Sequence, residues 1–574
     1  MDNREKPKQA PLSRAVSLLQ GAARSIERLH YPPLGPDFGS LSGDHLASAL
    51  IAHRFVKNLG STVVPADIRR KQSIRAMLEY DQNGLTSFDY RAVPQPYRGL
   101  LLQAKAWLQT YFGKIPRRHG FRPPTGETVV TAMGTVDLIS KLTDGQQWNV
   151  SLEASRDAAA VCYHNHALKR VVKARFRSMD PPAGLAQRWF HECPTGVRPG
   201  WYVFHLMFTY CCNIVNVSRL STVPKNGEKD RTITMEPMWN MIAQLSYAAD
   251  LRGVLRSRLG IDLESRAALH RTLIRHAEKA TIDFANASNS NWTCVLKWLL
   301  PTAMYRKLMQ LRTATCEYDG EYHHLNMLAP MGCGFTFEVM TIVLLALSRV
   351  LDPGATVFGD DVIIDRRVAS SFVALTSHAG WKVNESKSFS EGNFRESCGG
   401  FHDLSTGLDL LSYDFHQPES MFDVCTSANK LYRLLTRATV DAGLRKILLS
   451  TYCSLIRLLP CETFRDATLV SEDLPAGVVL VPAGFTQRYR APGVVERLVA
   501  SYWHMPVEVN YKWILDPVVS RPKVETVTSA VYLACYIRRG SSYDGLARKQ
   551  TLRYVTEIAT RGIPLAMVPL MSFI

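Results

Sequence analysis

The chain has 574 residues, of which 46% are hydrophobic and 21% are charged. This balance excludes an intrinsically disordered protein, and no apolar run reaches the roughly 20 residues that a membrane-spanning helix needs. Lys and Arg number 68 against 51 Asp and Glu, so the net charge of +17 favours polyanionic partners such as nucleic acid.

The N-terminal sequence is charged and lacks the apolar stretch of a signal peptide, so we expect a soluble protein that stays where it is made. The twelve cysteines are scattered, which favours reduced thiols in a cytosol. "CYHNH" (162–166) and "HH" (323–324) have the residue types of metal sites. Neither is accompanied by a second cluster at zinc spacing, so we expect ordinary core or surface residues.

From about 40 to 220, helical patterns alternate with segments in which basic and aromatic residues are interleaved. The densest are "YFGKIPRRHGFRPP" (111–124) and "LKRVVKARFR" (168–177). Guanidinium groups that meet phosphates and rings that stack on bases are typical of a nucleic-acid groove. A solvated helix face would show the same composition, so both interpretations stay open.

Between 281 and 390 the elements become regular. "ATIDF" (280–284) predicts a short strand ending at Asp283, and apolar residues at helical spacing follow up to Pro301, with Trp292 and Trp298 expected in the core. The loop "MGCG" (331–334) precedes an apolar helix over 336–351, which we expect to be buried. "ATVFGDDVIID" (355–365) then predicts two strands around a Gly-Asp turn, and a helix (368–380) and a strand (381–389) follow. This order predicts an α+β fold in which helices pack on an antiparallel sheet.

Three carboxylates stand at the ends of these strands. If the strands pair, Asp283 comes close to Asp360 and Asp361. Three anions together are costly without a cation, and Mg²⁺ prefers oxygen ligands, so the sequence predicts a site for two Mg²⁺ ions, with Mn²⁺ as a substitute. Such a site serves phosphoryl transfer. Asp283 as a helix cap is the simpler alternative.

A turn-rich loop (221–237) supplies the positive charge that substrate phosphates need. It carries Lys225, Lys229 and Arg231 close together. Such cations can hold a triphosphate and neutralise the charge that develops on it.

Six motifs occur in one order: "VPKNGEKDR…MEP", "TIDFANASNS", "MGCGFTFE", "FGDD", "NESKSF" and "FSEGNFRESCGG". Over about 220–402 the chain resembles the RNA-directed RNA polymerase (replicase) subunit of single-stranded RNA bacteriophages, the levivirus group. The resemblance implies a right-handed polymerase with fingers, a palm of antiparallel sheet and packed helices, and a helical thumb. It implies an N-terminal region (1–90) packing on fingers and thumb, fingers (91–275), palm (276–400) and thumb (401–574).

The resemblance also implies residue roles. Asp283, Asp360 and Asp361 match metal-binding catalytic aspartates, with Asp360 the firmer ligand of its pair. Lys387 matches a lysine that protonates departing pyrophosphate, although a solvated lysine is the alternative. The remaining matches are nucleotide-binding positions: Lys225, Lys229, Arg231, Gly332, Gly334, Thr336, Glu338 and Asn289. Glu338 would also be favoured by the helix dipole alone. The segment 392–400 resembles a structural primer-grip hairpin.

Two positions depart from the family pattern. Asn289 stands where the family has a second aspartate, so we expect altered sugar discrimination before any loss of catalysis. Phe358 replaces a tyrosine and keeps its apolar packing.

The implied function is template-directed synthesis of RNA from ribonucleoside triphosphates, copying a single-stranded RNA phage genome in the host cytoplasm. The alternatives are a polymerase like a reverse transcriptase and a non-enzymatic RNA-binding protein. The implied partners are template and product RNA, host elongation factors Tu and Ts and a host ribosomal protein. No membrane partner is expected.

Overall fold

The computed structural model describes residues 11–459, apart from 62, 123, 125–127, 129–140 and 143–146, together with residues 464–466 and 479–482. Most of the segment beyond 459, which the sequence predicts to belong to a thumb, therefore lies outside the described residues. Within those described, no helix has both the length and the hydropathy of a membrane span. The ten described cysteines are all free thiols.

The helices of the first half are α1 (Pro11–Glu27), α2 (Pro36–Gly39), α3 (Gly43–Val56), α4 (Ala66–Gln82), α5 (Tyr97–Phe112), α7 (Leu152–His164), α8 (His166–Ser178), α9 (Leu185–His191), α10 (Pro199–Tyr210), α11 (Met238–Leu259) and α12 (Leu263–Leu273). Those of the second half are α13 (Thr293–Leu299), α14 (Thr302–Leu311), α15 (Thr336–Arg349), α16 (Ala369–His378), α17 (Met421–Arg437) and α18 (Ala442–Ile456). The 3₁₀ turns are η1 (Tyr90–Ala92), η2 (Ala287–Ser290), η3 (Arg366–Val368) and η4 (Glu385–Lys387).

The strands fall into several small sheets. The central antiparallel sheet has the order β5 (Lys279–Ile282), β10 (Asp361–Asp365), β9 (Thr356–Phe358). A four-stranded sheet has the order β4 (Asp230–Met235), β3 (Val217–Pro224), β7 (Thr315–Tyr318), β8 (Glu321–His324). A third has the order β12 (Phe394–Ser397), β13 (Gly400–Asp403), β14 (Leu408–Asp409). The pairs are β1 (Asn149–Val150) with β2 (Asn213–Ile214), β6 (Phe284–Ala285) with β11 (Lys382–Val383), and β15 (Phe464–Asp466) with β16 (Val479–Val481).

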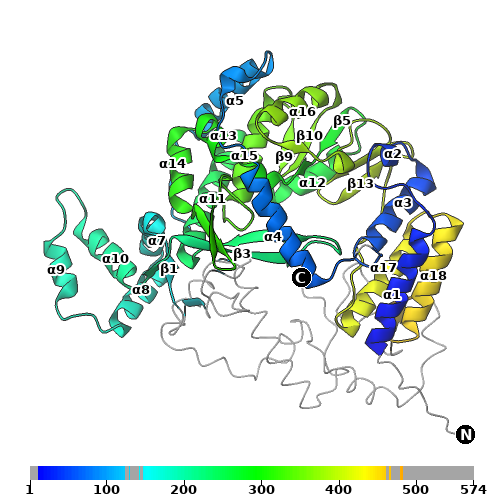
Figure 1. The fold of residues 1–574 in the computed structure, drawn as a ribbon, viewed down its shortest axis with the longest axis horizontal. Coiled ribbons are helices and arrows are strands. Elements are labelled where there is room, and N and C mark those ends of the chain that lie inside the picture. The colour runs from blue at the N-terminus through cyan, green and yellow to red at the C-terminus, as the bar shows by residue number, and fades with distance from the viewer. Residues whose placement is uncertain are drawn as a thin grey trace, which may run out of the picture.

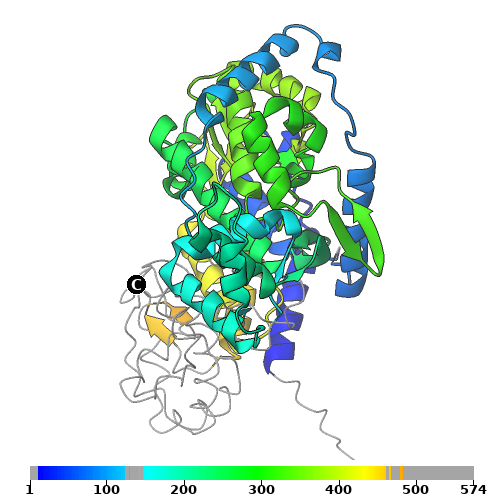
Figure 2. The same ribbon diagram turned by 90° about the vertical axis from the view of Figure 1, so that its left-hand side faces the viewer.

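Three groups of elements follow one another across the molecule (Figure 1). Helices α8, α9 and α10 lie at one end, the bundle of α1, α3, α17 and α18 lies at the other, and the central sheet with its helices lies between them. Helix α4 lies against the four-stranded sheet, as Figure 2 shows from the side. The predicted α+β class with an antiparallel sheet is confirmed.

The largest hydrophobic core surrounds α15. This helix is apolar on nearly all sides, and Val339, Val343 and Leu347 are fully buried in it. It packs on α5, α11, α16 and the central sheet, which confirms the prediction of a buried helix. A separate core holds the bundle of α1, α3, α17 and α18 together, so the first and last described helices share one packing unit.

Two local predictions were wrong in part. The strand expected over 381–389 is paired only at β11 and at a bridge between Phe389 and Thr281, because the backbone between them turns through η4. Trp292 is buried as expected, but Trp298 is only half-buried. Its indole stacks on the ring of Tyr90 with centroids 4.9 Å apart, and the ammonium of Lys105 lies over it.

Candidate active site

The register of the central sheet brings the predicted aspartates to one end. Val362 of β10 pairs with Ile282 of β5, so Asp361 and Asp283, the next residues along, continue the same antiparallel register. Phe358 pairs with Asp361, which leaves Gly359 and Asp360 as a two-residue hairpin turn. The predicted pairing of these strands is therefore confirmed.

Gly359 is required by the packing of this turn. Its φ of +67° lies in the left-handed region, and a Cβ there would come within 2.7 Å of the Phe337 ring. Its amide donates a hydrogen bond to the Thr341 hydroxyl at 3.0 Å, which ties the turn to α15. The glycine thus lets the turn lie on the buried helix and fixes where Asp360 stands.

A cavity of about 1920 Å³ opens at this end of the sheet, and we call it the central cavity. Asp283 and Asp360 line it. The carboxylate of Asp361 instead faces the turn between β12 and β13, where Oδ2 accepts a hydrogen bond from the backbone N–H of Cys398 at 3.2 Å. The two neighbouring aspartates therefore have different surroundings.

The carboxylates are not fully compensated by cations. Burial raises the pKa of Asp283, the negative charge of Asp360 raises it further, and Lys387 acts against both. Burial, followed by the charges of Asp360 and Asp283, raises the pKa of Asp361 to about 6. Both shifts have the sign expected where negative charge gathers in a partly desolvated site.

Lys387 is the cation nearest to these acids. It lies in η4 and its Nζ is 3.2 Å from Oδ2 of Asp283. Burial lowers the pKa of the Lys387 ammonium, but the charges of Asp283 and Glu396 outweigh burial, so the net shift is upward. Lys387 is therefore held protonated beside the carboxylate.

The predicted basic loop lies at the same cavity. Lys225 and Lys229, from the turn between β3 and β4, and Arg231, at the start of β4, all line it. Desolvation by the cavity wall, followed by repulsion from Lys387 and Arg231, lowers the pKa of Lys225. An ion pair between Asp230 and Arg69 of α4 anchors the loop. Segments more than 50 residues apart in the chain thus face the aspartates with positive charge.

The motif over 331–338 also lines the cavity, and its glycines are positions of close packing. Gly332 has a φ of +110°, and a Cβ there would lie 2.1 Å from the Thr234 carbonyl oxygen. A Cβ on Gly334 would meet the side chain of Gln244 at 3.0 Å. These contacts hold the loop against β4 and α11.

Thr336 and Glu338 are occupied by contacts within the protein. The Thr336 hydroxyl donates to the Pro330 carbonyl at 2.8 Å. The Glu338 carboxylate pairs with Nε of Arg252 at 2.6 Å. In this arrangement the groups position the loop and Arg252.

Asn289 and Phe358, the two departures from the family pattern, lie in different environments. Asn289 lies in η2 and lines the cavity, half-buried. Phe358 packs edge-on against Phe337, with ring centroids 4.8 Å apart. This contact needs no hydroxyl, so the apolar packing expected of Phe358 is confirmed.

Two cavity residues were missed by sequence reasoning. Arg252 of α11 and Glu396 of β12 line the cavity, and burial raises the pKa of Glu396 to about 7. Arg252 stands in α11, a helix that is buried on most of its sides, so no local pattern marks it. Glu396 lies within the quoted segment 389–400, which also carries Glu391 and Arg395, so its charge alone did not mark it.

The donor set suits a divalent cation, although not as a complete cage. Among the described residues, no group of three or more His, Cys, Asp and Glu side chains is arranged as a metal-ligand set. Asp361 is turned to Cys398 and Asp283 is paired with Lys387. Asp283 and Asp360, which face the cavity with oxygen donors only, are the pair that fits Mg²⁺ or a similar ion.

Comparison with known proteins finds similarity to RNA-directed RNA polymerase subunits of bacteriophages. The RNA-directed RNA polymerase subunit beta of Enterobacteria phage SP is 32% identical over 295 residues, covering 47% of this chain and 50% of that protein. The same subunit of Qbeta virus (strain MX1) is 34% identical over 254 residues, covering 42% of each chain. The chain thus spans about half the length, or less, of these curated relatives.

A solved RNA-dependent RNA polymerase of a human picorbirnavirus is 16% identical with a TM-score of 0.30, covering 42% of this chain and 56% of that chain. The family model described as RNA replicase, beta-chain, matches residues 135–483, which is more than half of this chain and includes every predicted site residue. The chain therefore belongs to the RNA replicase beta-chain family.

Proposed function

We propose that this chain synthesises RNA from ribonucleoside triphosphates on an RNA template, and so replicates a single-stranded RNA phage genome. The observation that carries the proposal is the composition of the central cavity. Asp283 and Asp360 face it from the central sheet, while Lys225, Lys229 and Arg231 face it from a separate loop. Acids for a metal and cations for a triphosphate in one cavity are what nucleotidyl transfer requires.

Asp283 and Asp360, with Asp361 in support, are the residues that would hold two Mg²⁺ ions, for which Mn²⁺ would substitute. When bound, such ions lower the pKa of the attacking 3′-hydroxyl and stabilise the charge on the leaving phosphate. Around that site, Lys225, Lys229 and Arg231 bind the triphosphate and keep it oriented.

Lys387 is the proposed general acid. Its protonated Nζ, held at 3.2 Å from Asp283, is close enough to the acids to reach a bound triphosphate. As negative charge builds on the departing pyrophosphate, this ammonium gives up a proton to it. Asn289 faces the same cavity and would contact the sugar of the incoming nucleotide.

The proposal extends to domains and partners. We assign residues 91–275 to fingers, 276–400 to a palm, 401–574 to a thumb, and 1–90 to a region that packs on both. The contacts of α4 with β3 and β4, and of α1 with α18, support the role given to 1–90. The proposed partners are host elongation factors Tu and Ts and a ribosomal protein, and the proposed location is the cytoplasm of the bacterial host.

The test is incorporation of labelled ribonucleotides on an RNA template by the purified chain, with and without host extract. Asp283→Asn and Asp360→Asn should each lower the rate by about 10³-fold, because each removes an oxygen donor from the proposed metal site. Asp365→Asn is the matched control: it lies on the same strand as Asp361 but pairs with Arg367, so it should stay within about twofold of the wild type.

Each alternative has its own outcome. Wild-type rates in both cavity variants would contradict the metal assignment. Equal use of deoxyribonucleotides would favour a polymerase like a reverse transcriptase. RNA binding without incorporation, even with host extract, would favour a non-enzymatic protein.

A further inference from the structure

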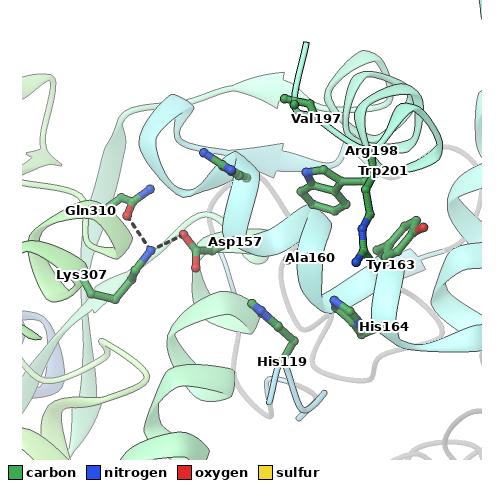
Figure 3. Close-up of a pocket in the computed structure, with 12 residues that line it drawn as sticks. His119, Asp157, Ala160, Tyr163, His164, Val197, Arg198, Trp201, Lys307 and Gln310 are labelled. Carbon is green, nitrogen blue, oxygen red and sulfur yellow. Dashed lines mark hydrogen bonds and ion pairs between the residues drawn. The ribbon is translucent and has the colours of Figure 1, made fainter. Parts of the chain in front are cut away.

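A second pocket lies in the lobe formed by α7 to α10, and its lining shares no residue with the central cavity. It has a volume of about 530 Å³, within the range of small-ligand sites. Helix α7, the start of α10, helix α14 and the loop containing His119 enclose it (Figure 3). We call it the lobe pocket.

One side of the lobe pocket is a set of aromatic rings. Trp201 lies between two neighbours: Tyr163 meets its indole edge-on at 5.3 Å, and His205 stacks on it at 5.8 Å. His119 and His164 stack on each other with centroids 5.1 Å apart and planes 9° apart. Figure 3 shows the rings of Trp201, Tyr163, His164 and His119 gathered on one side of the pocket. The contacts hold the rings in fixed orientations, so their stacking surfaces are preformed.

The other side is a closed ion-pair cluster. Nζ of Lys307 lies 2.9 Å from Asp157 and donates to the Gln310 side-chain oxygen at 2.7 Å (Figure 3). Arg117 adds a second cation at 3.2 Å from Asp157. The one carboxylate of the pocket lining is therefore already neutralised.

The rim carries the positive charge that is left over. Arg156 of α7 and Arg198, just before α10, are exposed, and neither makes an ion pair with any residue that the structure describes. Two guanidinium groups over a neutralised floor suit an anion rather than a cation. The histidines do not point to a metal, because no third ligand joins them among the described residues.

We propose that the lobe pocket binds a single unpaired nucleotide, whose base stacks on the Trp201 ring beside the edge-on ring of Tyr163 and whose phosphate pairs with Arg156 and Arg198. Preformed aromatic surfaces beside guanidinium groups are the features with which proteins hold single-stranded nucleic acid. The same chemistry would accept one nucleotide of an RNA strand or a free mononucleotide. The site draws on His119 of the basic, aromatic segment 111–124 and on Tyr163 and His164 of "CYHNH", none of which lines the central cavity. It stands whether or not the central cavity synthesises RNA.

The test uses the full-length chain and an oligoribonucleotide of about six residues that carries 4-thiouridine, irradiated in the absence of nucleoside triphosphates. Adducts are mapped by peptide mass spectrometry, and binding is followed by fluorescence anisotropy. We expect adducts in the peptides that contain Tyr163 or Trp201, in addition to any from the central cavity. Because each adduct is assigned to a peptide, the yield at the lobe pocket is measured separately from the yield at the central cavity.

Two pairs of variants test the contacts. Trp201→Leu should lower the pocket adduct yield about tenfold, whereas Trp201→Phe, which keeps an aromatic ring, should lower it much less. Arg198→Gln should lower the pocket adduct yield several-fold. It should also reduce the number of counterions released on binding, read from the salt dependence of the affinity, by about one. Arg198 is exposed, so its replacement should not affect folding. Arg188→Gln removes the same charge from exposed α9 of this lobe, outside the pocket, and should leave the yield unchanged.

Competition identifies the source of the nucleotide. If free UMP displaces the pocket adduct as well as unlabelled oligonucleotide does, the site takes mononucleotides; if only the oligonucleotide does, it takes a strand. The proposal is overturned if no adduct maps to the lobe pocket, or if Arg198→Gln and Arg188→Gln give equal yields. Neither result depends on nucleotide incorporation, so a failure here is distinct from a failure of the proposed function.

Discussion

The central cavity and the lobe pocket each contain a lysine paired with an aspartate. In the cavity, Lys387 lies 3.2 Å from Asp283, and in the pocket, Lys307 lies 2.9 Å from Asp157. The pairs differ in their next neighbours. Asp283 stands beside a second carboxylate, Asp360, whereas Asp157 has a second cation within 3.2 Å.

This difference decides what each pair can do. Asp157 is neutralised twice over, so its pair stabilises the lobe and leaves the pocket able to accept an anion. Asp283 is only partly neutralised, so its pair leaves negative charge for a cation to meet. The same two residue types thus serve packing in one region and chemistry in the other, because the third charge differs.

The largest expected effect comes from neutralising each aspartate. Asp283→Asn should lower ribonucleotide incorporation by about 10³-fold with no loss of thermal stability, because it relieves repulsion from Asp360. Asp157→Asn should leave the rate per folded molecule unchanged but lower the unfolding free energy by about 2 kcal/mol, because Lys307 loses its carboxylate partner and Arg117 keeps only Asp250. Incorporation assays and urea unfolding measure both. A rate loss in Asp157→Asn as large as in Asp283→Asn would remove the distinction.

Replacing each lysine comes next. Lys387→Met should slow incorporation by about 10²-fold, because the leaving pyrophosphate loses its proton donor. Lys387→Arg should not restore the rate, since guanidinium keeps its proton near neutral pH. Lys307→Met is the matched control and should change the rate less than about twofold. Single-turnover kinetics distinguish the chemical step from binding, and full activity in Lys387→Arg would exclude the proton-transfer role.

The two regions should respond to pH with opposite signs. Burial, followed by Arg117 and His164, lowers the pKa of His119 to about 4, so its unfolding free-energy contribution is lost as pH falls from about 6.5 towards 4. Burial raises the pKa of Glu396 to about 7, so its contribution is lost as pH rises from about 4.5 towards 7.

Over its pH interval, each group should change the unfolding free energy by about 1 kcal/mol, because both side chains keep some contact with solvent. Urea unfolding midpoints of His119→Gln and Glu396→Gln, measured at pH 5 and pH 7.5, check this. The His119 variant should lose part of the acid sensitivity, and the Glu396 variant should gain relative stability at the higher pH. Identical pH profiles for both variants and the wild type would show that neither group carries the shift.

The smallest expected effect concerns sugar selectivity. Asn289→Asp should change the ratio of ribonucleotide to deoxyribonucleotide incorporation by about tenfold or less, because it exchanges one hydrogen-bonding group at the cavity wall. Gln310→Glu makes the same chemical change at the lobe pocket and should leave the ratio as it is. Competition between labelled substrates gives the ratio directly. An equal change in both variants would mean that Asn289 acts only through overall charge.

The parts of the fold that were predictable are those in which a local pattern is sufficient. The apolar run of α15 fixes a buried helix, and the Gly-Asp turn between two β-branched runs fixes the β9–β10 hairpin. Asp283 and Asp360 could be found because strand ends and turns are readable positions. The strand pairing then followed from their order in the chain.

The parts that were missed depend on distant partners. The predicted strand over 381–389 is interrupted because the Asn384 amide donates to the Asp283 carbonyl at 2.8 Å and the Ser388 hydroxyl accepts from the Asp283 amide at 3.0 Å. The β7–β8 hairpin joins a sheet through the parallel pairing of β7 with β3, nearly 100 residues earlier. Likewise, the Arg252–Glu338 pair joins two helices 86 positions apart. No local pattern encodes such choices.

The bundle of α1, α3, α17 and α18 has a consequence for the order in which the chain is made. The Tyr31 hydroxyl, just after α1, bonds to the carboxylate of Asp441 at the start of α18, 410 positions later. At translation rates of about 5 to 20 residues per second, α1 waits about 20 to 80 s on the ribosome before this partner has been made. During that time the apolar face of α1, with Leu19 and Ile26, is not covered by α17 and α18, because these helices have not yet been made. Helix α1 is thus fully packed only after α17 and α18 have been made, so chaperones should bind this helix while the chain is still being synthesised.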